Sequence, residues 1–432
     1  MSINETAAKA RQAAIRMAAA TTEQKNQALR AVRTALLDNA DAIIAANAED
    51  MAQAQKDNLE APLLKRLKFD HTKINDVCEG IESLTALDDP VGQTLAATEL
   101  DTGLELYKVT CPIGVIGVIF ESRPDALVQI STLCLKSGNA VLLKGGSEAI
   151  GTNRVLAETI SKAAIAAGMP DGWLGLLETR GDVAEMLSLD DDIDLIIPRG
   201  SNEFVKHIMT HSNIPVLGHA DGICHVYIDA DADIDMAVNI AVDSKCQYVA
   251  VCNAEETLLV HKAVAADILP KLKEAMEAKG VELLGCEKTQ SIIEVKAATE
   301  EDWKTEYLDY ILSIRVVDSL ESAIDHINTY GSGHTDAIVT ANKETAAAFM
   351  DLVDSGDVFW NASTRFSDGF RYGLGAEVGI STNKIHARGP VGLEGLLIYK
   401  WRMIGNGQIV ADYGGPDGKK FTHRKLKKNW NG

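Results

Sequence analysis

Cys252 is a residue of this sequence whose type and setting could support nucleophilic chemistry. The segment QYVAVCNAEETLLV (247–260) puts it between a predicted amphipathic helix and a predicted apolar strand, where a side chain can face a cleft while its neighbours pack. A thiolate that attacks a carbonyl carbon forms a covalent intermediate and divides a hard reduction into two easier steps. The alternative for any single cysteine is a buried apolar side chain. We expect that alternative for the other cysteines, which stand at positions 78, 111, 134, 224, 246 and 286.

The elements that would position this thiol are predicted to be of α/β type. From residue 113 onward, short apolar segments alternate with amphipathic ones, such as GVIGVIF (114–120) followed by DALVQISTLCLKSG (125–138). Repeated β–α units of this kind form right-handed crossovers in a parallel sheet. Residues 1–90 are predicted to be helical, and the β–α alternation restarts after about residue 233, which predicts a second α/β domain.

Two segments are predicted to form a separate β structure. TLAATELDTGLELYKVT (94–110) alternates in hydrophobicity around an Asp-Thr-Gly turn and predicts a β-hairpin, and residues 393–415 have an extended pattern. A late strand beside an early hairpin predicts edges that pair with another subunit, and therefore a homo-oligomer. The sequence thus predicts a cofactor-binding domain formed by residues 1–93, 111–233 and 361–392, and a catalytic domain at residues 234–360. It also predicts an oligomerisation hairpin at 94–110 with its strand at 393–415, and a basic tail at 416–432.

Composition and charge exclude several classes of function. The 62 acidic and 42 basic residues give a net charge of −20, which repels phosphate backbones and argues against a nucleic-acid partner. The basic tail is expected to be a solvated charged end, with an anion-binding tail as the alternative. The N-terminus has no signal-peptide pattern, and no apolar run approaches the roughly 18 residues that a membrane span requires. Scattered cysteines without zinc-ligand spacing predict no metal site and a reducing, cytoplasmic location.

The order of these segments resembles the aldehyde dehydrogenase superfamily: a hairpin, a Rossmann-like sheet with the loop GNAVLLKGGS (138–147), a catalytic cysteine, a glycine-rich segment and a terminal strand. Within that superfamily, VVDSLESAIDHINTYGSGHTDAI (316–338) is similar to the signature of the γ-glutamyl phosphate reductase family, also called glutamate-5-semialdehyde dehydrogenases. CPIGVIGVIFESRPDA (111–126) and VCNAEETLLV (251–260) are similar to that family too, so the resemblance covers nearly the whole chain.

The resemblance implies a fold and a reaction. The implied fold is α/β and aldehyde-dehydrogenase-like, with a Rossmann-type cofactor domain, an α/β catalytic domain and a small β oligomerisation flap. The implied reaction is the NADPH-dependent reduction of L-glutamyl 5-phosphate to L-glutamate 5-semialdehyde and phosphate, a step of proline biosynthesis. Cys252 would carry the acyl group as a thioester, and the preceding enzyme, glutamate 5-kinase, would be a candidate partner.

The resemblance also implies cofactor-binding residues. Lys144, at the end of a predicted strand, matches the lysine that holds the adenosine ribose, although an ordinary surface lysine is the alternative. Ser147 stands where NAD-selective members often carry a glutamate; a hydroxyl can donate to a 2′-phosphate that a carboxylate would repel, which favours NADP. Gly200 and Ser201 match a turn that opens a helix near the pyrophosphate. Glu306 matches the glutamate that holds the nicotinamide ribose, with Asp309 as the alternative.

Two departures from the superfamily pattern concern catalysis. Hydrolytic members use a glutamate to activate water, whereas PVLGHADGICH (215–225) contains no glutamate and offers His219 instead, as a proton-transfer group or as a structural histidine. The superfamily's oxyanion-binding asparagine is replaced by Ser122, so we expect the backbone N–H of Cys252, assisted by Ser122 or Asn253, to stabilise the oxyanion.

An acyl phosphate with an amino-acid head needs cations for its anionic groups, and arginine suits both phosphate and carboxylate. Arg123, Arg365 and Arg388 lie in predicted loops, as does Arg371, and we expect two of these arginines to touch substrate. Each of them alone is more often a surface residue.

Three alternatives to an acyl-phosphate reductase remain. A hydrolytic semialdehyde dehydrogenase would not need phosphate, and an alcohol dehydrogenase of the histidinol type would need bound zinc. A non-catalytic scaffold for the glutamate kinase would not need Cys252 at all.

Overall fold

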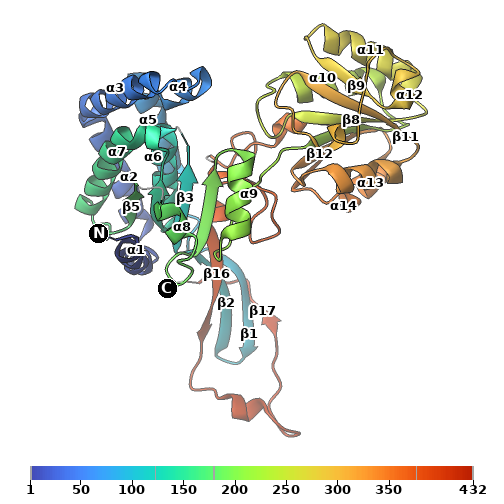
Figure 1. Cartoon of the computed structure of the whole chain (residues 1–432). Coiled ribbons are helices and arrows are strands. Elements are labelled where there is room, and N and C mark those ends of the chain that lie inside the picture. The colour runs from blue at the N-terminus through green and yellow to red at the C-terminus, as the bar shows by residue number, and fades with distance from the viewer. Residues whose placement is uncertain (1, 122, 179–180, 376, 431–432) are drawn as a thin grey trace. The chain divides into compact units, whose positions relative to one another are not determined.

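The computed structural model describes residues 2–121, 123–178, 181–375 and 377–430, which form two compact units (Figure 1). The first unit contains Met1–Gly200, His207–Val216 and Val391–Gly432. The second contains Ser201–Lys206 and Leu217–Pro390. No helix of the described residues is long and apolar enough to cross a membrane.

The first unit is built on a parallel sheet with the strand order β5-β4-β3-β6. All six residues of β3 and all five of β4 are buried, as expected for strands covered on both faces. Helix α6 begins at Pro124 and ends before Gly138, which adopts the left-handed conformation (φ 75°) that favours glycine. The strands of this sheet are β3 (Val115–Phe120), β4 (Ala140–Lys144), β5 (Leu174–Leu177) and β6 (Leu195–Arg199). The helices between them in the chain are α6 (Pro124–Ser137), α7 (Ile150–Ala166) and α8 (Gly181–Met186).

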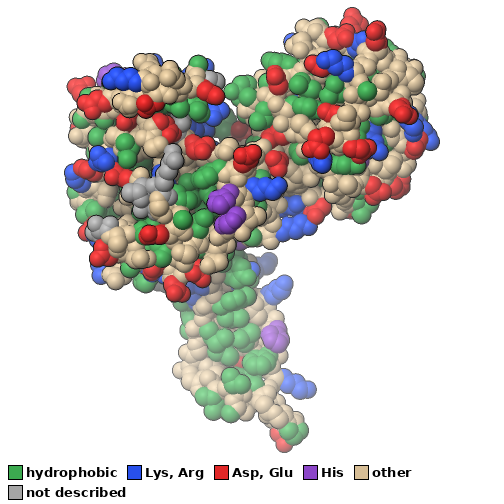
Figure 2. Space-filling model, viewed as in Figure 1, with side chains coloured by type: hydrophobic (Ala, Val, Ile, Leu, Met, Phe, Trp, Pro, Cys, Tyr) green, Lys and Arg blue, Asp and Glu red, His purple; other side chains and the backbone are tan. Residues whose placement is uncertain are grey.

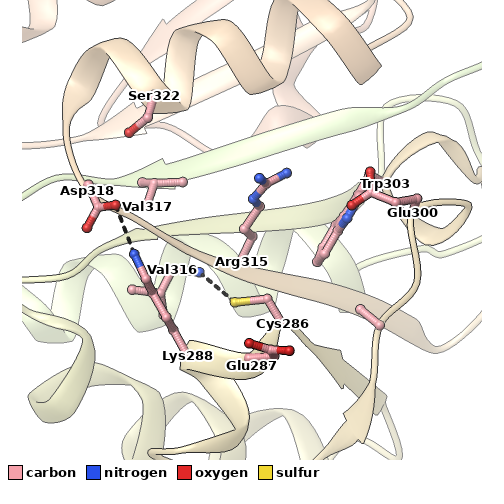
Figure 3. A pocket seen from close by; sticks show the side chains of 11 residues that line it. Cys286, Glu287, Lys288, Glu300, Trp303, Arg315, Val316, Val317, Asp318 and Ser322 are labelled. Carbon is pink, nitrogen blue, oxygen red and sulfur yellow. Dashed lines mark hydrogen bonds and ion pairs between the residues drawn. The ribbon is translucent and has the colours of Figure 1, made fainter.

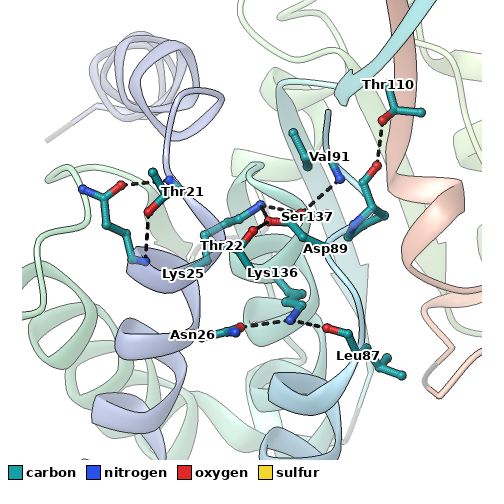
Figure 4. Close-up of polar contacts among 12 residues, drawn as sticks. Thr21, Thr22, Lys25, Asn26, Leu87, Asp89, Val91, Thr110, Lys136 and Ser137 are labelled. Carbon is teal, nitrogen blue, oxygen red and sulfur yellow. Dashed lines mark hydrogen bonds and ion pairs between the residues drawn. The ribbon is translucent and has the colours of Figure 1, made fainter. Parts of the chain in front are cut away.

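The predicted N-terminal helical region is confirmed as five helices, α1 (Ile3–Met17), α2 (Thr22–Asp38), α3 (Ala40–Lys56), α4 (Ala61–Leu67) and α5 (His71–Ala86). A cluster of buried polar side chains connects α2 to the segment that follows α5, residues 87–93, by hydrogen bonds and an ion pair (Figure 4). Lys25 of α2, which is buried, forms an ion pair with Asp89 at 2.6 Å. Lys136 of α6 donates to Asn26 at 2.9 Å and to the carbonyl of Leu87 at 2.7 Å. Each buried ammonium group is therefore matched by oxygen acceptors, as burial requires.

The predicted β structure forms an antiparallel sheet in the first unit, with the order β16-β2-β1-β17 (Figure 1). Its hairpin turns at Gly103 (φ 73°), as the Asp-Thr-Gly signal predicted. The tail is packed and is not simply a solvated end: Arg424 pairs with Glu99 at 2.6 Å, and Trp430 packs edge-on against Tyr107. The strands are β1 (Thr94–Asp101), β2 (Leu104–Pro112), β16 (Leu397–Ile404) and β17 (Arg424–Lys425).

The second unit is built on a seven-stranded sheet with the order β10-β9-β11-β8-β7-β12-β13, whose paired strands are parallel. Its strands are β7 (Cys224–Ile228), β8 (Glu255–His261), β9 (Glu282–Gly285), β10 (Lys296–Ala297), β11 (Ile311–Val317), β12 (Thr335–Val339) and β13 (Asp357–Trp360). Helices α10 and α11 cover one face and α13 and α14 the other (Figure 1). The helices of this unit are α10 (Ile234–Cys246), α11 (Ala265–Glu277), α12 (Glu287–Gln290), α13 (Leu320–Tyr330) and α14 (Lys343–Leu352).

The boundaries of the two compact units differ from those of the predicted domains. Strand β7 (224–228), predicted in the cofactor-binding domain, pairs with β8 and β12 of the second unit. Residues 217–233 and 361–390 also belong to the second unit. The β–α alternation predicts strands but not the sheet that each strand joins, because pairing with distant strands decides that. The remaining elements are α9 (Asn202–His211), β14 (Gly379–Ser381) and β15 (Gly389–Val391).

Candidate active site

Cys252 lies in the loop between α10 and β8, at the amino end of β8. Parallel strands begin at one edge of a sheet, so this edge also holds Cys224 at the start of β7 and His334 just before β12. The Cys252 side chain is partly buried. The backbone at Gly222 passes so close that a Cβ there would lie 2.2 Å from the Cys252 carbonyl oxygen, which only glycine avoids. The loops at this edge are therefore packed around Cys252.

Two histidines accompany the thiol. One potential ligand atom from each of His219, Cys252 and His334 lies within 4.8 Å of the other two. His219 Nδ1 lies 3.0 Å from the carbonyl oxygen of Ile380, and because a carbonyl only accepts, that nitrogen carries the proton and the lone pair is on Nε2. His334 is 1% exposed, its Nδ1 lies 2.8 Å from the Thr335 hydroxyl, and its Nε2 has no hydrogen-bond partner among the described residues.

The electrostatic setting favours the neutral forms of Cys252 and His334. Burial, reinforced by the carboxylates of Glu306 and Glu377, raises the pKa of Cys252 to about 12, while its own backbone N–H and Arg365 act in the opposite direction. Burial and the neighbouring His219 hold the pKa of His334 well below its usual value. The resting sulfur is thus a thiol near neutral pH, and its activation requires a proton acceptor.

Asn253 stabilises the loop that carries Cys252 through two hydrogen bonds. Its Nδ2 donates to the carbonyl of Ser367 at 2.7 Å, and its own carbonyl accepts from the Thr364 hydroxyl at 2.7 Å. One of its amide N–H bonds is thereby used, which leaves the second for any oxyanion. Ser122, the other predicted oxyanion donor, lies outside the described residues.

The predicted arginines differ in their surroundings. Arg365 is 8% exposed, donates to Gln247 at 2.9 Å and acts electrostatically on Cys252. Arg388 is held by Asp354, to whose carboxylate it donates at 3.2 Å and to whose carbonyl it donates at 2.9 Å. Arg123 belongs to the first unit and stands 3.8 Å from Asp125 there. Only Arg365, among these three, is brought to the thiol within the second unit.

The predicted cofactor residues divide between the two units. In the first, Lys144 ends β4 and donates to the carbonyl of Gly145 at 2.5 Å, and Ser147 is exposed just beyond. Gly200 ends the first segment of the first unit, and Ser201 begins the first segment of the second, immediately before α9. In the second, the Glu306 carboxylate accepts from Asn202 at 2.5 Å, and burial raises its pKa.

A pocket of about 480 Å³ lies at the opposite, carboxyl edge of the sheet in the second unit, where β9 and β11 end (Figure 3). It is lined by Cys286, Lys288 and Arg315 among others, and by none of the predicted site residues. Although burial disfavours its thiolate, hydrogen bonds from Thr289 and from the backbone of Val316 lower the pKa of Cys286. Cys286 is therefore a partly exposed thiol with polar partners, and the sequence prediction of a buried apolar side chain is wrong for it.

Sequence reasoning singled out Cys252 and His219 but missed His334. The segment GHTDAI indicates the family through its similarity to a signature, and no local pattern in it marks the histidine as functional. The sequence does contain a signal for His334, because this residue directly precedes a predicted apolar strand and Cys252 stands shortly before another. The amino ends of parallel strands lie at one edge of a sheet, so residues just before such strands can lie close together.

Comparison with known proteins identifies the class to which this fold belongs. The sequence model described as "Aldehyde dehydrogenase family" matches residues 1–290, so the chain belongs to the aldehyde dehydrogenase family. Proteins named gamma-glutamyl phosphate reductase from Acetivibrio thermocellus and Pelotomaculum thermopropionicum are each 67% identical to it over 430 residues, which cover 100% of this chain and 100% and 99% of theirs. The crystal structure of gamma-glutamyl phosphate reductase from Thermotoga maritima matches with a TM-score of 0.92 and 38% identity, covering 94% of this chain and 99% of that one.

Within that class the chain belongs to the γ-glutamyl phosphate reductase family. The α/β, aldehyde-dehydrogenase-like fold expected from the sequence is thereby confirmed.

Proposed function

We propose that this protein reduces L-glutamyl 5-phosphate with NADPH to L-glutamate 5-semialdehyde and phosphate, in proline biosynthesis. The observation that carries the proposal is the 67% identity, over the whole chain, to relatives named for that reductase activity. A homo-oligomer in the cytoplasm is part of the proposal, as is glutamate 5-kinase as a candidate partner.

Cys252 is the proposed nucleophile. Its Sγ attacks the acyl carbon, the carbon–oxygen bond to phosphate breaks, and a thioester remains on the protein. NADPH, when bound, supplies a hydride to the thioester carbon. The resulting thiohemiacetal collapses to the aldehyde and returns the sulfur as thiolate.

His219 is the proposed proton acceptor. A thiol whose pKa is raised to about 12 must lose its proton as the sulfur attacks, and the departing phosphate must gain one. The hydrogen bond to Ile380 leaves the lone pair of His219 on Nε2, the form that a general base requires. A single imidazole can then pass the thiol proton to the phosphate oxygen.

The oxyanion and the substrate anions need donors of their own. We propose the backbone N–H of Cys252, with Asn253 and Ser122, for the oxyanion. Arg365 is the best supported of the proposed substrate cations, since it acts on Cys252 from a largely buried position, with Arg123 and Arg388 as the others.

The residues present fit an NADP-type cofactor in charge and position. Lys144 stands at the carboxyl end of β4, where open parallel sheets bind ligands, and the exposed Ser147 offers a hydroxyl beside it. The Glu148 carboxylate lies against Gly146 in the same loop and would repel a 2′-phosphate. For that phosphate to bind, its attraction to Lys144 and Ser147 must exceed this repulsion. Gly200 and Ser201 are proposed for the pyrophosphate and Glu306 for the nicotinamide ribose.

Oligomerisation is supported by the apolar surface of the antiparallel sheet in the first unit (Figure 2). Tyr399, Trp401 and Met403, alternate residues on one face of β16, are 45%, 56% and 57% exposed. Large exposed apolar side chains in a row are typical of protein–protein contacts.

The deciding experiment runs the reaction in reverse, from glutamate semialdehyde. We expect NADPH formation that depends on phosphate, is lost in Cys252→Ser and persists in Cys286→Ser, a matched control at the opposite edge of the sheet. Equal rates with and without phosphate would instead establish the hydrolytic alternative, although residues 215–225 contain no glutamate to activate water. A Cys252→Ala protein that is fully active in vivo would establish the scaffold.

A further inference from the structure

We propose that His219, Cys252 and His334 also form a three-ligand site for a soft divalent cation such as Zn²⁺, and that the cation competes with the acyl group for the sulfur. No ligand spacing in the sequence predicts such a site, since the second ligand stands 33 positions after the first and the third stands 82 positions after the second. That the cation inhibits the enzyme rests on the proposed function, whereas its binding does not.

The ligand types and their separations suit zinc. Thiolate and imidazole are the donors that Zn²⁺ prefers, and tetrahedral bonds to them set the ligand atoms roughly 3.3–3.6 Å apart. The three atoms here already lie within 4.8 Å of one another. A contraction of about an ångström, which rotation of the Cys252 side chain and small shifts of the rings can supply, completes the geometry.

His219 is oriented as metal-ligating histidines usually are. Such residues typically donate the other ring N–H to a carbonyl, which fixes the ring and its tautomer. His219 does this through Nδ1 to Ile380, 3.0 Å away. The Nδ1 of His334 is engaged with the Thr335 hydroxyl, and its buried Nε2 has no partner among the described residues. A buried polar atom without a partner is costly, and in the tautomer that donates from Nδ1 to Thr335 a cation would satisfy the Nε2 lone pair.

The charges around the sulfur favour a cation. Glu306 and Glu377 act on Cys252 and disfavour its thiolate, and a bound divalent cation would reverse that balance. The thiol proton is released to solvent as the sulfur–metal bond forms, so binding strengthens as pH rises. Three protein ligands leave the fourth position open to water or a phosphate oxygen.

The sulfur can bond to the metal or to the acyl carbon, but not to both in a productive complex. Zinc should therefore inhibit the reaction, a chelator should reverse the inhibition, and prior acylation of Cys252 should protect against it. This behaviour is opposite to that of the histidinol-type alternative, in which zinc would be required.

Cobalt titration of the whole protein tests the site directly, because a Co²⁺–thiolate bond gives a charge-transfer absorption that imidazole ligands do not. We expect the band in the wild-type protein, its displacement by Zn²⁺, and its loss in Cys252→Ser. His334→Asn and His219→Asn should each weaken cobalt binding by more than about tenfold, since even supporting residues matter by that much. His219 is only partly buried, so its variant tests the site even if the buried His334→Asn protein fails to fold.

Two controls remove competing explanations. His207 and His211 lie one turn apart on the exposed face of α9, with ring centroids 4.1 Å apart, and could bind cobalt by themselves. The His207→Asn/His211→Asn protein and Cys286→Ser should both keep the charge-transfer band. A band that survives in Cys252→Ser, or an affinity unchanged in both His219→Asn and His334→Asn, overturns the proposal.

Failure of this inference is distinguishable from failure of the proposed function. No charge-transfer band in a wild-type enzyme whose activity requires Cys252 would refute the metal site alone. A band lost in a Cys252→Ser protein that retains full reductase activity would refute the role of Cys252 while supporting the site.

Discussion

Lys245 and Glu256 form a fully buried ion pair, with Nζ and Oε2 2.6 Å apart, and they enclose the segment that carries Cys252. Lys245 is near the end of α10 and Glu256 near the start of β8, so the pair ties the two ends of this loop together. Glu256 also accepts from the backbone N–H of Leu308 at 3.2 Å, two residues after Glu306. The pair therefore holds both the thiol loop and the Glu306 segment.

We expect Lys245→Met to lower the free energy of unfolding by about 3–5 kcal/mol, because it leaves a buried carboxylate without its partner. Denaturant titration measures this change. Lys262→Met, which removes an exposed pair with Asp318, is the control and should change stability by less than about 1 kcal/mol. The double variant Lys245→Met/Glu256→Leu should recover most of the lost free energy of unfolding. If it does not, the uncompensated charge of Glu256 is not the cause of the lower stability.

The two cysteines at opposite edges of the sheet should respond differently to pH. Burial and nearby carboxylates raise the pKa of Cys252 to about 12, so its alkylation rate in the unliganded protein should rise about tenfold per pH unit through the neutral and mildly alkaline range. Hydrogen bonds that outweigh burial lower the pKa of Cys286, so its rate should level off at lower pH. Peptide-resolved mass spectrometry after iodoacetamide pulses gives both profiles. A plateau for Cys252 near neutral pH would contradict the neutral resting thiol.

Gly222→Ala should impair catalysis far more than folding. A Cβ at this position would lie 2.4 Å from the Cys252 Cα and must displace the proposed nucleophile, and a displacement of about an ångström can reduce a rate by about 100-fold. Steady-state kinetics should show the loss mainly in kcat. Gly80→Ala, in α5, is the matched control: nothing lies within 4 Å of the added Cβ, so activity should persist and stability should rise by about 0.4–1 kcal/mol.

Ser147→Glu should shift cofactor preference from NADPH toward NADH by about tenfold, equivalent to about 1.4 kcal/mol, because a carboxylate repels the 2′-phosphate. The ratio of kcat/KM for the two cofactors measures this. Ser147→Ala separates loss of the hydroxyl from gain of the charge, and an unchanged ratio in Ser147→Glu would place the 2′-phosphate elsewhere.

Lys144→Ala should raise the Michaelis constant for NADPH by about 10–100-fold, the range for losing a hydrogen bond from a charged group. The Michaelis constant for the acyl phosphate should change far less. Equal effects on both constants would mean that the substitution disturbs the fold, which a thermal melt would reveal.

The amino-acid sequence determined the local features of this protein. The apolar runs of β3 and β4, the Asp-Thr-Gly turn of the hairpin and the helices before residue 90 follow from periodicity and turn chemistry, which act over a few residues. The motif around Cys252 and the segment ending in GHTDAI were sufficient to recognise the family.

Only the tertiary structure decided which distant residues meet. Strand β7 joins the second sheet and the tail pairs with β1, because hydrogen bonding between strands far apart in sequence leaves no local pattern. The same strand order brings His219 and His334 to Cys252 and gives Cys252 and Cys286 opposite pKa shifts. A side chain's reactivity depends on the charges and donors that the fold collects around it, and most of these come from elsewhere in the chain.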